Sequence, residues 1–93
     1  MEFEWDAAKN DACFTHRGFG FSYAVRAFQD DGRIVGRDRR RDYDEDRYRL
    51  LGTIEGRVFV VIYTMRGSVV RIISAHKANA RETREYEHST RED

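Results

Sequence analysis

Three consecutive segments in the second half of the chain, residues 47–54, 57–65 and 68–75, are rich in apolar residues. Runs of this length between turn signals are typical of β-strands, in which successive side chains point to opposite faces of a sheet. Two dipeptides that end in glycine, Glu55-Gly56 and Arg66-Gly67, separate the segments and favour two-residue hairpin turns. The pattern therefore predicts an antiparallel sheet with three long strands.

The first third of the chain predicts a short strand, over residues 1–5, followed by two helices. Asp6 is a suitable N-cap for the first helix and Gly18 a suitable end. Its expected apolar side consists of Ala8, Ala12, Cys13 and His16. A second short helix is predicted over residues 21–29, where apolar residues recur at i, i+3, i+4 and i+7 as Phe21, Ala24, Val25 and Phe28.

The remaining elements are an edge strand and a C-terminal helix. Residues 33–37 predict the strand, and a charge-dense loop follows it over residues 38–46. Asn79 and Glu82 form a capping box, which predicts a helix over residues 80–88. Residues 74–78 are then expected to connect the last strand to this helix. The helix is polar nearly all round apart from Tyr86, and both contact with another chain and simple solvent exposure explain that pattern.

Two-residue turns also predict which side chains share a face of the sheet. They place Arg49, Ile62 and Arg71 in one row, on a face that also carries Arg47, Thr64, Val69, Leu51, Val60 and Ile73. The opposite face is expected to form a core against the first two helices with Tyr48, Tyr63, Val70, Leu50, Val61, Ile72 and Phe59. The predicted fold is α+β, a small antiparallel sheet with an N-terminal strand and two helices packed on one face and a C-terminal helix. We expect a single domain over residues 1–93.

The arginines on the first face need partners, because a buried guanidinium group without one is too costly to keep. Arg71 interrupts an apolar run, so it has to meet a carboxylate, backbone carbonyl groups, water or a ligand. One interpretation is an ion pair with Glu45, Asp46 or the C-terminal helix. The other is an anion site, which three arginines on one face favour, because guanidinium groups bind phosphate through paired hydrogen bonds.

Composition limits how an anion would bind and where the protein would work. The chain has 15 arginines, two lysines and a formal net charge of zero, so a polyanion would have to bind through local arginine groups. Cys13 is the single cysteine and cannot form an intrachain disulfide. The sequence has neither an apolar run of membrane-spanning length nor the apolar stretch of a signal peptide. We therefore expect a cytoplasmic protein without membrane association.

Several other chemistries find little support in the sequence. It contains no metal-ligand spacing such as Cys-x-x-Cys or His-Glu-x-x-His, and no glycine-rich phosphate loop after a strand. We therefore expect neither a metal nor a cofactor. Tyr43, Tyr48 and Tyr63 are possible stacking partners for nucleic-acid bases, although aromatic residues in strands more often belong to a core.

Three segments together resemble the BrnT family of toxins. They are "FEWDAAK" at residues 3–9, "DEDRYRLLG" at 44–52 and "RIISAHKANARE" at 71–82, in the order and spacing typical of the family. The chain differs from the expected pattern at His16-Arg17-Gly18, where Lys-His-Gly is usual, and at His76, where arginine is usual.

This resemblance implies a type II toxin of the RelE-like superfamily. Such a toxin has a small antiparallel sheet with helices on one side, and it is an endoribonuclease that inhibits translation. The implied partners are RNA, on or off the ribosome, and a BrnA-type antitoxin with a ribbon-helix-helix DNA-binding part. Operator DNA would be contacted only through the antitoxin.

RNA cleavage without a metal requires a base for the ribose 2′-hydroxyl, an acid for the leaving oxygen and positive charge over the phosphorane. We expect Arg71 and Arg47 to stabilise the phosphorane with help from Lys77. His76 is the expected proton-transfer group, because an imidazole titrates near neutral pH.

Carboxylates and further cations complete the expected site. Glu45 or Asp46 is expected either to act as the base or to orient Arg47. The expected substrate-binding residues are Arg49, Lys9 and His16, the last two on the condition that the first helix borders the arginine face.

Two other functions are compatible with the sequence. One is a toxin-like binding module with weakened or lost catalysis that acts as a corepressor with its antitoxin, which the changes at His16-Arg17 and His76 motivate. The other is a protein-interaction domain whose arginine face receives an acidic partner segment.

Overall fold

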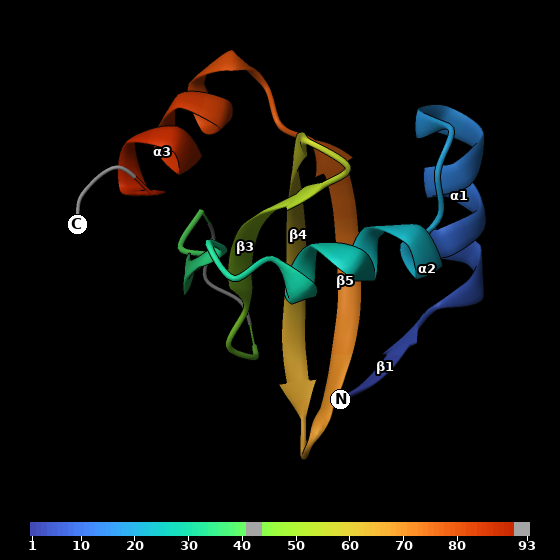
Figure 1. The fold of residues 1–93 in the computed structure, drawn as a ribbon. Helices are drawn as coiled ribbons and strands as arrows, with labels where there is room; N and C mark the ends of the chain where they lie inside the picture. The colour runs from blue at the N-terminus through green and yellow to red at the C-terminus, as the bar shows by residue number, and fades with distance from the viewer. Residues whose placement is uncertain (41–43, 91–93) are drawn as a thin grey trace.

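A computed structural model describes residues 1–40 and 44–90 of the chain, and within them it confirms the predicted α+β class. The elements are β1 (Glu2–Trp5), α1 (Ala7–Arg17), α2 (Phe21–Ala24), the 3₁₀-helix η1 (Val25–Gln29), β2 (Ile34–Arg37), β3 (Tyr48–Ile54), β4 (Arg57–Arg66), β5 (Val69–Lys77) and α3 (Ala80–Thr90). Figure 1 shows α1 and α3 on opposite sides of the strands. The central part of the charge-dense loop, including Tyr43, lies outside the described residues.

The strands form one sheet in the order β1-β5-β4-β3-β2. β1 runs parallel to β5, and the other neighbouring pairs are antiparallel. β1 pairs with β5 only from Glu2 opposite Val69 to Trp5 opposite Ile72. Beyond Ile72, the last residues of β5 therefore have no partner strand on that side within the described chain.

Short-range sequence signals determine the ends of α1 as predicted. The side chain of Asp6 accepts a hydrogen bond from the backbone N–H of Lys9, and Gly18 ends the helix with a φ of 82°. Such a left-handed conformation suits glycine, which has no Cβ to clash with the backbone. Cys13 is the buried residue of α1, whereas Ala8, Ala12 and His16 are exposed, so the predicted apolar side of this helix is largely wrong.

The segment predicted as a second helix is divided in two. α2 ends at Ala24 and the chain continues as η1 up to Gln29, a tighter helix than the α-helix predicted from apolar spacing. The predicted burial of this segment holds nonetheless, because Phe21, Ala24 and Phe28 are buried.

The first hairpin has the predicted turn and register. Glu55 and Gly56 have φ angles of 50° and 80°, as a two-residue type I′ turn requires, and Arg49 lies opposite Ile62. In the second hairpin the turn consists of Gly67 and Ser68 instead. Arg71 therefore lies opposite Thr64, and the predicted pairing of Arg71 with Ile62 is wrong.

A β-bulge in β5 changes which residues share a face. Tyr63 faces Ile72 and Ile62 faces Ser74, so Ile73 is an extra residue on β5. After the bulge the alternation is inverted, and His76 faces Val60 while Lys77 faces Phe59. The strand also continues to Lys77, through most of the segment predicted to connect it to the last helix, residues 74–78.

The two faces of the sheet have separate apolar clusters. One face packs against α1, α2 and η1, and its buried strand residues are Leu50, Ile54, Phe59, Val61, Val70, Ile72 and Ala75. The other face carries a smaller cluster of Leu51, Val58, Val60, Ile62 and Ala78, covered in part by Tyr86 of α3. None of the helices in the described ranges has the length and apolar character needed to cross a membrane.

Candidate functional site

A polar cleft of about 220 Å³ lies between α3 and the face of the sheet that α1 and α2 leave uncovered. We call it the Arg49–His76 cleft, after the two basic side chains that β3 and β5 contribute. The residues that line it are Arg40, Arg49, Val60, Ile62, His76, Asn79, Arg81, Glu82 and Glu85. Because the bulge inverts the alternation of β5, His76 lies on the same face of the sheet as Arg49.

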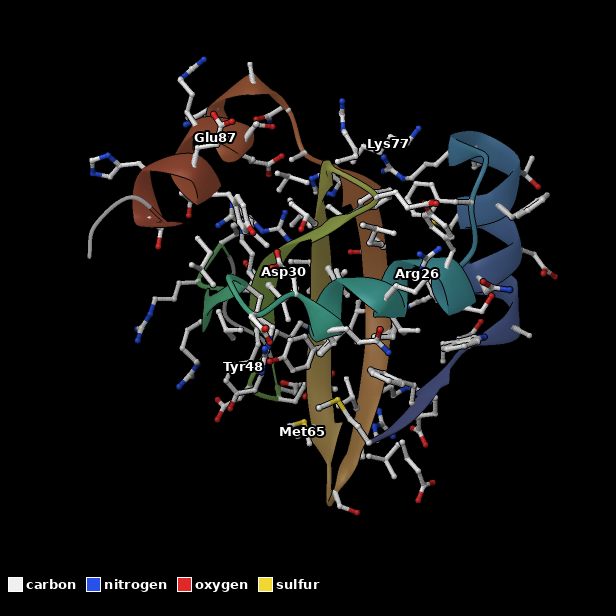
Figure 2. All side chains as sticks on the ribbon, in the orientation of Figure 1. Arg26, Asp30, Tyr48, Met65, Lys77 and Glu87 are labelled. Atoms are coloured by element: carbon white, nitrogen blue, oxygen red, sulfur yellow. The ribbon has the colours of Figure 1, made fainter. Side chains whose placement is uncertain are left out.

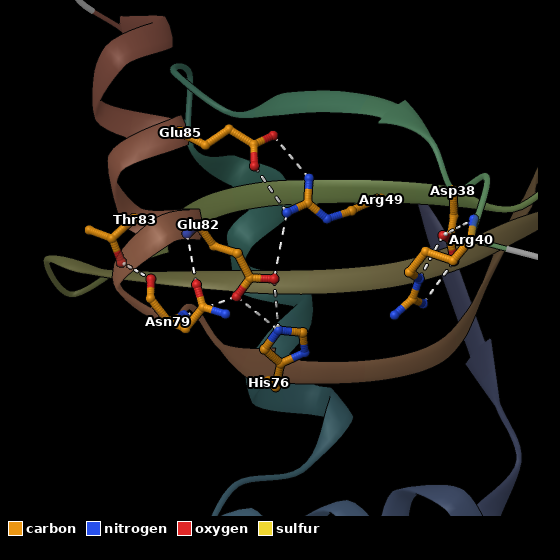
Figure 3. Close-up of polar contacts among 8 residues, drawn as sticks. All are labelled: Asp38, Arg40, Arg49, His76, Asn79, Glu82, Thr83 and Glu85. Atoms are coloured by element: carbon orange, nitrogen blue, oxygen red, sulfur yellow. Dashed lines mark hydrogen bonds and ion pairs between the residues drawn. The ribbon is translucent and has the colours of Figure 1, made fainter.

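Two carboxylates of α3 bind the basic groups of this cleft (Figure 3). Glu82 lies 3.2 and 3.3 Å, through its two carboxylate oxygens, from Nε2 of His76 and 3.5 Å from Nη2 of Arg49. Glu85 accepts two hydrogen bonds from the Arg49 guanidinium group, at 3.0 and 3.1 Å. The cleft therefore brings an arginine and a histidine of the sheet into contact with two carboxylates of α3.

The capping box of α3 positions Glu82. Its carboxylate accepts a hydrogen bond from the backbone N–H of Asn79 at 2.9 Å, and the Asn79 side chain accepts one from the backbone N–H of Glu82 at 2.8 Å. Burial raises the pKa of Glu82, but the hydrogen bonds from Asn79 and His76 and the nearby charges outweigh it, so the pKa is lowered. An ionised carboxylate only accepts hydrogen bonds, so Glu82 favours a His76 imidazole that carries its proton on Nε2.

Arg71 and Arg47 lie farther along the same face, outside the Arg49–His76 cleft. Arg71 donates a 2.8 Å hydrogen bond to Glu4 on the neighbouring strand β1, a partner that none of the predicted ion pairs included. Nε of Arg47 lies 3.6 Å from a carboxylate oxygen of Glu45. Thr64, which lies opposite Arg71, donates a 2.6 Å hydrogen bond to the backbone carbonyl of Asp46.

The structure separates the predicted site residues into groups. Arg49 and His76 meet in the cleft, with Arg47, Glu45 and Arg71 at the other end of the same face. Lys77 lies on the opposite face, opposite Phe59. Lys9 and His16 belong to α1, which packs against that opposite face, so α1 does not border the Arg49–His76 cleft.

Sequence reasoning missed the carboxylate that holds α3 in place. Asp30 accepts hydrogen bonds from the backbone N–H and the hydroxyl of Thr53, at 2.8 and 2.9 Å, and from the backbone N–H of Gly32 at 2.8 Å. It also accepts one from the hydroxyl of Tyr86. An aspartate two residues before a glycine predicts only the local turn, because its contacts with β3 and α3 depend on the tertiary structure.

A second missed group lies beside the cleft. The guanidinium of Arg40 donates two hydrogen bonds to the buried carboxylate of Asp38, at 2.8 and 2.9 Å, so Arg40 is held where it lines the cleft. The backbone N–H of Asp38 in turn donates to the carbonyl of Arg47 at 2.8 Å. Within residues 1–40 and 44–90, no group of three or more histidine, cysteine or acidic side chains is placed to hold a metal ion.

Acid is expected to weaken the attachment of α3. Burial raises the pKa of Asp30, but its hydrogen bonds from Tyr86, Thr53 and Gly32 outweigh that effect and lower it. A carboxyl group whose pKa is lower in the folded state stabilises the fold above its unfolded pKa, and this contribution is lost as the pH falls through the folded value. Between about pH 5 and pH 2, the Tm measured by circular dichroism should therefore fall more steeply for the wild type than for Asp30→Asn. Equal slopes would contradict this role of Asp30.

Comparison with known proteins identifies one family. A family model described as the ribonuclease toxin, BrnT, of type II toxin-antitoxin systems matches residues 5–82. The matched segment contains Arg49 and His76 and ends at Glu82, in the first turn of α3. No curated protein matches the chain.

Proposed function

The chain belongs to the BrnT family of ribonuclease toxins of type II toxin-antitoxin systems, and from this premise we propose that it cleaves RNA without a metal ion in the Arg49–His76 cleft. The observation that carries the proposal is the joint position of an arginine and a histidine beside a cleft. Their shared carboxylate, Glu82, lies 3.2 Å from His76 and 3.5 Å from Arg49 and holds the two basic groups side by side.

In the proposed reaction, the ribose 2′-hydroxyl attacks the adjacent phosphorus and displaces the 5′-oxygen of the next nucleotide. The products are a 2′,3′-cyclic phosphate and a 5′-hydroxyl. His76 transfers a proton to the leaving oxygen, and Arg49 stabilises the negative charge that develops on the phosphorane. Glu82 orients the imidazole and is the nearest carboxylate that can accept the proton of the 2′-hydroxyl.

The remaining basic residues of the face are proposed to bind flanking phosphates. Arg71 lies opposite Thr64, next to the row of Arg49 and Ile62, and Arg47 directly precedes β3, so an RNA strand along the face would meet both. Glu45 lies near both Arg47 and Arg66, which supports a role in orienting Arg47 over a role as the base.

The carboxylates of α3 compete with the proposed substrate for Arg49. Replacement of Glu85 by glutamine removes the paired acceptor of the Arg49 guanidinium but keeps the shape of the side chain. We expect Glu85→Gln to bind RNA about two- to fivefold more tightly, since a partly exposed ion pair of this kind contributes about 0.2–1 kcal/mol. The measurement is fluorescence anisotropy with a labelled RNA oligonucleotide. Glu87→Gln, which removes one charge from α3 outside the cleft, is the matched control. An equal gain in RNA affinity for Glu87→Gln would mean that the effect comes from the change in net charge alone.

The biological consequence we propose is translation arrest by RNA cleavage, neutralised by a BrnA-type ribbon-helix-helix antitoxin. Regulation of operator DNA would then occur through the antitoxin. Two observations support a protein partner: α3 is a largely polar helix with no fully buried residue among those whose exposure is described, and it lies over the proposed site. An antitoxin that covers this helix or takes its place would control access to Arg49 and His76.

A second function, that of a catalytically weakened corepressor, is favoured by one specific observation. Arg49 and His76 are both paired with α3 carboxylates in the unbound chain, so these two groups are masked until the carboxylates move. The two functions differ in what the isolated chain does to RNA.

The deciding experiment is inducible expression of the chain in bacteria without an antitoxin, with growth followed and RNA ends mapped. Growth arrest with new ends that carry cyclic phosphates is the expected result, and the purified chain should cleave RNA equally well with and without EDTA. Soluble, folded protein that leaves both growth and RNA unchanged would exclude the ribonuclease and favour the corepressor. Cleavage abolished by EDTA would exclude the metal-independent mechanism.

A further inference from the structure

The helical side of the molecule contains a second and larger depression. A groove of about 960 Å³ lies between α1, the beginning of α2 and the turn that joins β3 to β4. Four aromatic rings line it, Phe14, Phe19, Tyr23 and Phe59, and two cations, Arg57 and Lys77, stand at its rim. We call it the Phe14 groove, because Phe14 is 63% exposed whereas Phe19 and Phe59 are buried. Among the described residues no ring stacks on Phe14, so its exposed face is available to a ligand.

The charged residues around the Phe14 groove differ in their hydrogen-bond and ion-pair partners within the described part of the chain. Glu55 accepts a 2.7 Å hydrogen bond from the hydroxyl of Tyr23 and lies 3.7 Å from Arg26. Asp11 is a second acidic residue of the lining, on the side formed by α1. Lys77, at the end of β5, has neither an ion pair nor a side-chain hydrogen bond within the described part of the chain. The cation that remains available therefore lies where the groove meets β5.

The end of β5 joins the Phe14 groove to the Arg49–His76 cleft. Since the bulge inverts the alternation of the strand, His76 points into the cleft and the next residue, Lys77, lines the groove. β1 accompanies β5 only as far as Ile72, and α1 lies beside the edge at Ala75, whose carbonyl accepts a hydrogen bond from the Cys13 thiol, so within the described residues the edge is open at the exposed Lys77. Figure 2 shows Lys77 at this end of the strand, between α1 and the connection into α3. A chain that passes over the edge can occupy both depressions.

We propose that the Phe14 groove binds the single-stranded RNA that continues from the phosphate held in the Arg49–His76 cleft. A base stacks on the ring of Phe14, and the backbone phosphate that crosses the open edge of β5 contacts Lys77. Single-stranded nucleic acids bind through this combination of exposed aromatic rings and nearby cations, and every base offers a face for stacking. The proposal rests on the proposed function for the position of the scissile phosphate, and it adds a separate subsite for the flanking nucleotides.

A protein segment is the competing occupant, since an exposed phenylalanine can also anchor a partner. The position of the groove favours RNA. Its free cation lies next to His76 across a single peptide unit, so one continuous polyanion satisfies both sites. A protein segment anchored on Phe14 would have no need of this continuity.

The test is a binding measurement that does not depend on cleavage. The probes are fluorescein-labelled RNAs of mixed sequence, 12 nucleotides or three nucleotides long, with 2′-O-methyl groups that prevent attack by the 2′-hydroxyl. Wild type, Phe14→Ala and Phe14→Tyr are compared by anisotropy, with Val35→Ala as the control, because Val35 is likewise exposed (49%) and lies on the edge strand β2 away from the groove. We expect Phe14→Ala to bind the longer RNA about tenfold more weakly and the trinucleotide as the wild type does, since one stacked base accounts for a change of this order. Phe14→Tyr and Val35→Ala should bind both probes as the wild type does.

Unchanged binding of the longer RNA by Phe14→Ala would overturn the proposal, whatever the cleavage assay shows. So would a Phe14→Ala chain that binds both RNAs normally but fails to form the complex with its antitoxin, because the groove would then be a protein-docking site. If the proposed function is wrong, no new RNA ends appear on expression. The RNA affinities of Phe14→Ala and the wild type then still show whether the groove binds RNA.

Discussion

RNA cleavage by His76→Ala is expected to be about 100- to 10,000-fold slower than by the wild-type chain, the usual contribution of a general acid or base. His76 is the only imidazole in the Arg49–His76 cleft, and Glu82 holds it beside the guanidinium of Arg49. The measurement is the rate of cleavage of a labelled RNA under single-turnover conditions. Because the side chain is partly exposed and lies at the end of a strand, the variant should keep its circular dichroism spectrum.

The matched control is His16→Ala, which removes an exposed histidine from α1 on the other side of the sheet. Its cleavage rate should remain within about twofold of the wild type, since it lies outside the region where proton transfer is proposed. Arg71→Ala tests whether the reaction takes place at the other end of the arginine face. If Arg71→Ala abolishes cleavage while His76→Ala retains it, the reaction takes place at the Arg71 end and our assignment to the cleft is wrong.

The sequence was sufficient to predict those features of the fold that depend on neighbouring residues. Asp6, Gly18 and the Asn79–Glu82 capping box each act within about one helical turn, and all three end or begin a helix as predicted. The Glu55-Gly56 turn is equally local, because both of its residues adopt positive φ. These signals need no knowledge of the rest of the molecule.

The β-bulge is the feature that the sequence did not reveal, and it decides the composition of the site. Ile72 belongs to the core under α1 and α2, whereas Ile73 packs against the smaller cluster on the other face. Two adjacent isoleucines are compatible with a regular strand as well, so the inversion of the faces follows from packing on both sides of the sheet. Without the bulge, Lys77 would lie on the face of Arg71, and His76 would point toward α1.

The sequence predicted that a charged residue such as Arg71 needs a partner of opposite charge, but it did not predict which residue that partner is. That Arg71 needs a carboxylate follows from its place in an apolar run, and the structure provides one in Glu4, 67 residues earlier in the chain. This pairing requires the parallel alignment of β1 with β5, for which the sequence has no short-range signal. The same holds for Asp30 and Tyr86, which are 56 residues apart.

Replacement of Gly52 by alanine is expected to lower the free energy of unfolding by about 2–3 kcal/mol, because the added methyl group has no space. A Cβ at Gly52 would lie 2.5 Å from the carbonyl oxygen of Ala27, which is backbone of η1 and not the movable end of a side chain. η1 must then move away from β3, and the packing of the buried residues Ala27 and Phe28 is disturbed with it. Thermal unfolding followed by circular dichroism should show a Tm lower by roughly 10–20 °C for a domain of this size.

Gly36→Ala is the matched control for Gly52→Ala. Gly36 also lies within a strand, but it is exposed on β2, and a Cβ there would meet no atom within 4 Å. We expect its free energy of unfolding to stay within about 0.5 kcal/mol of the wild type. A comparable loss in both variants would mean that glycine is needed in these strands for its backbone freedom. A loss of stability confined to Gly52→Ala would show that glycine is required for the contact between η1 and β3. This contact lies on the face of the sheet where Leu50 and Ile54 are buried.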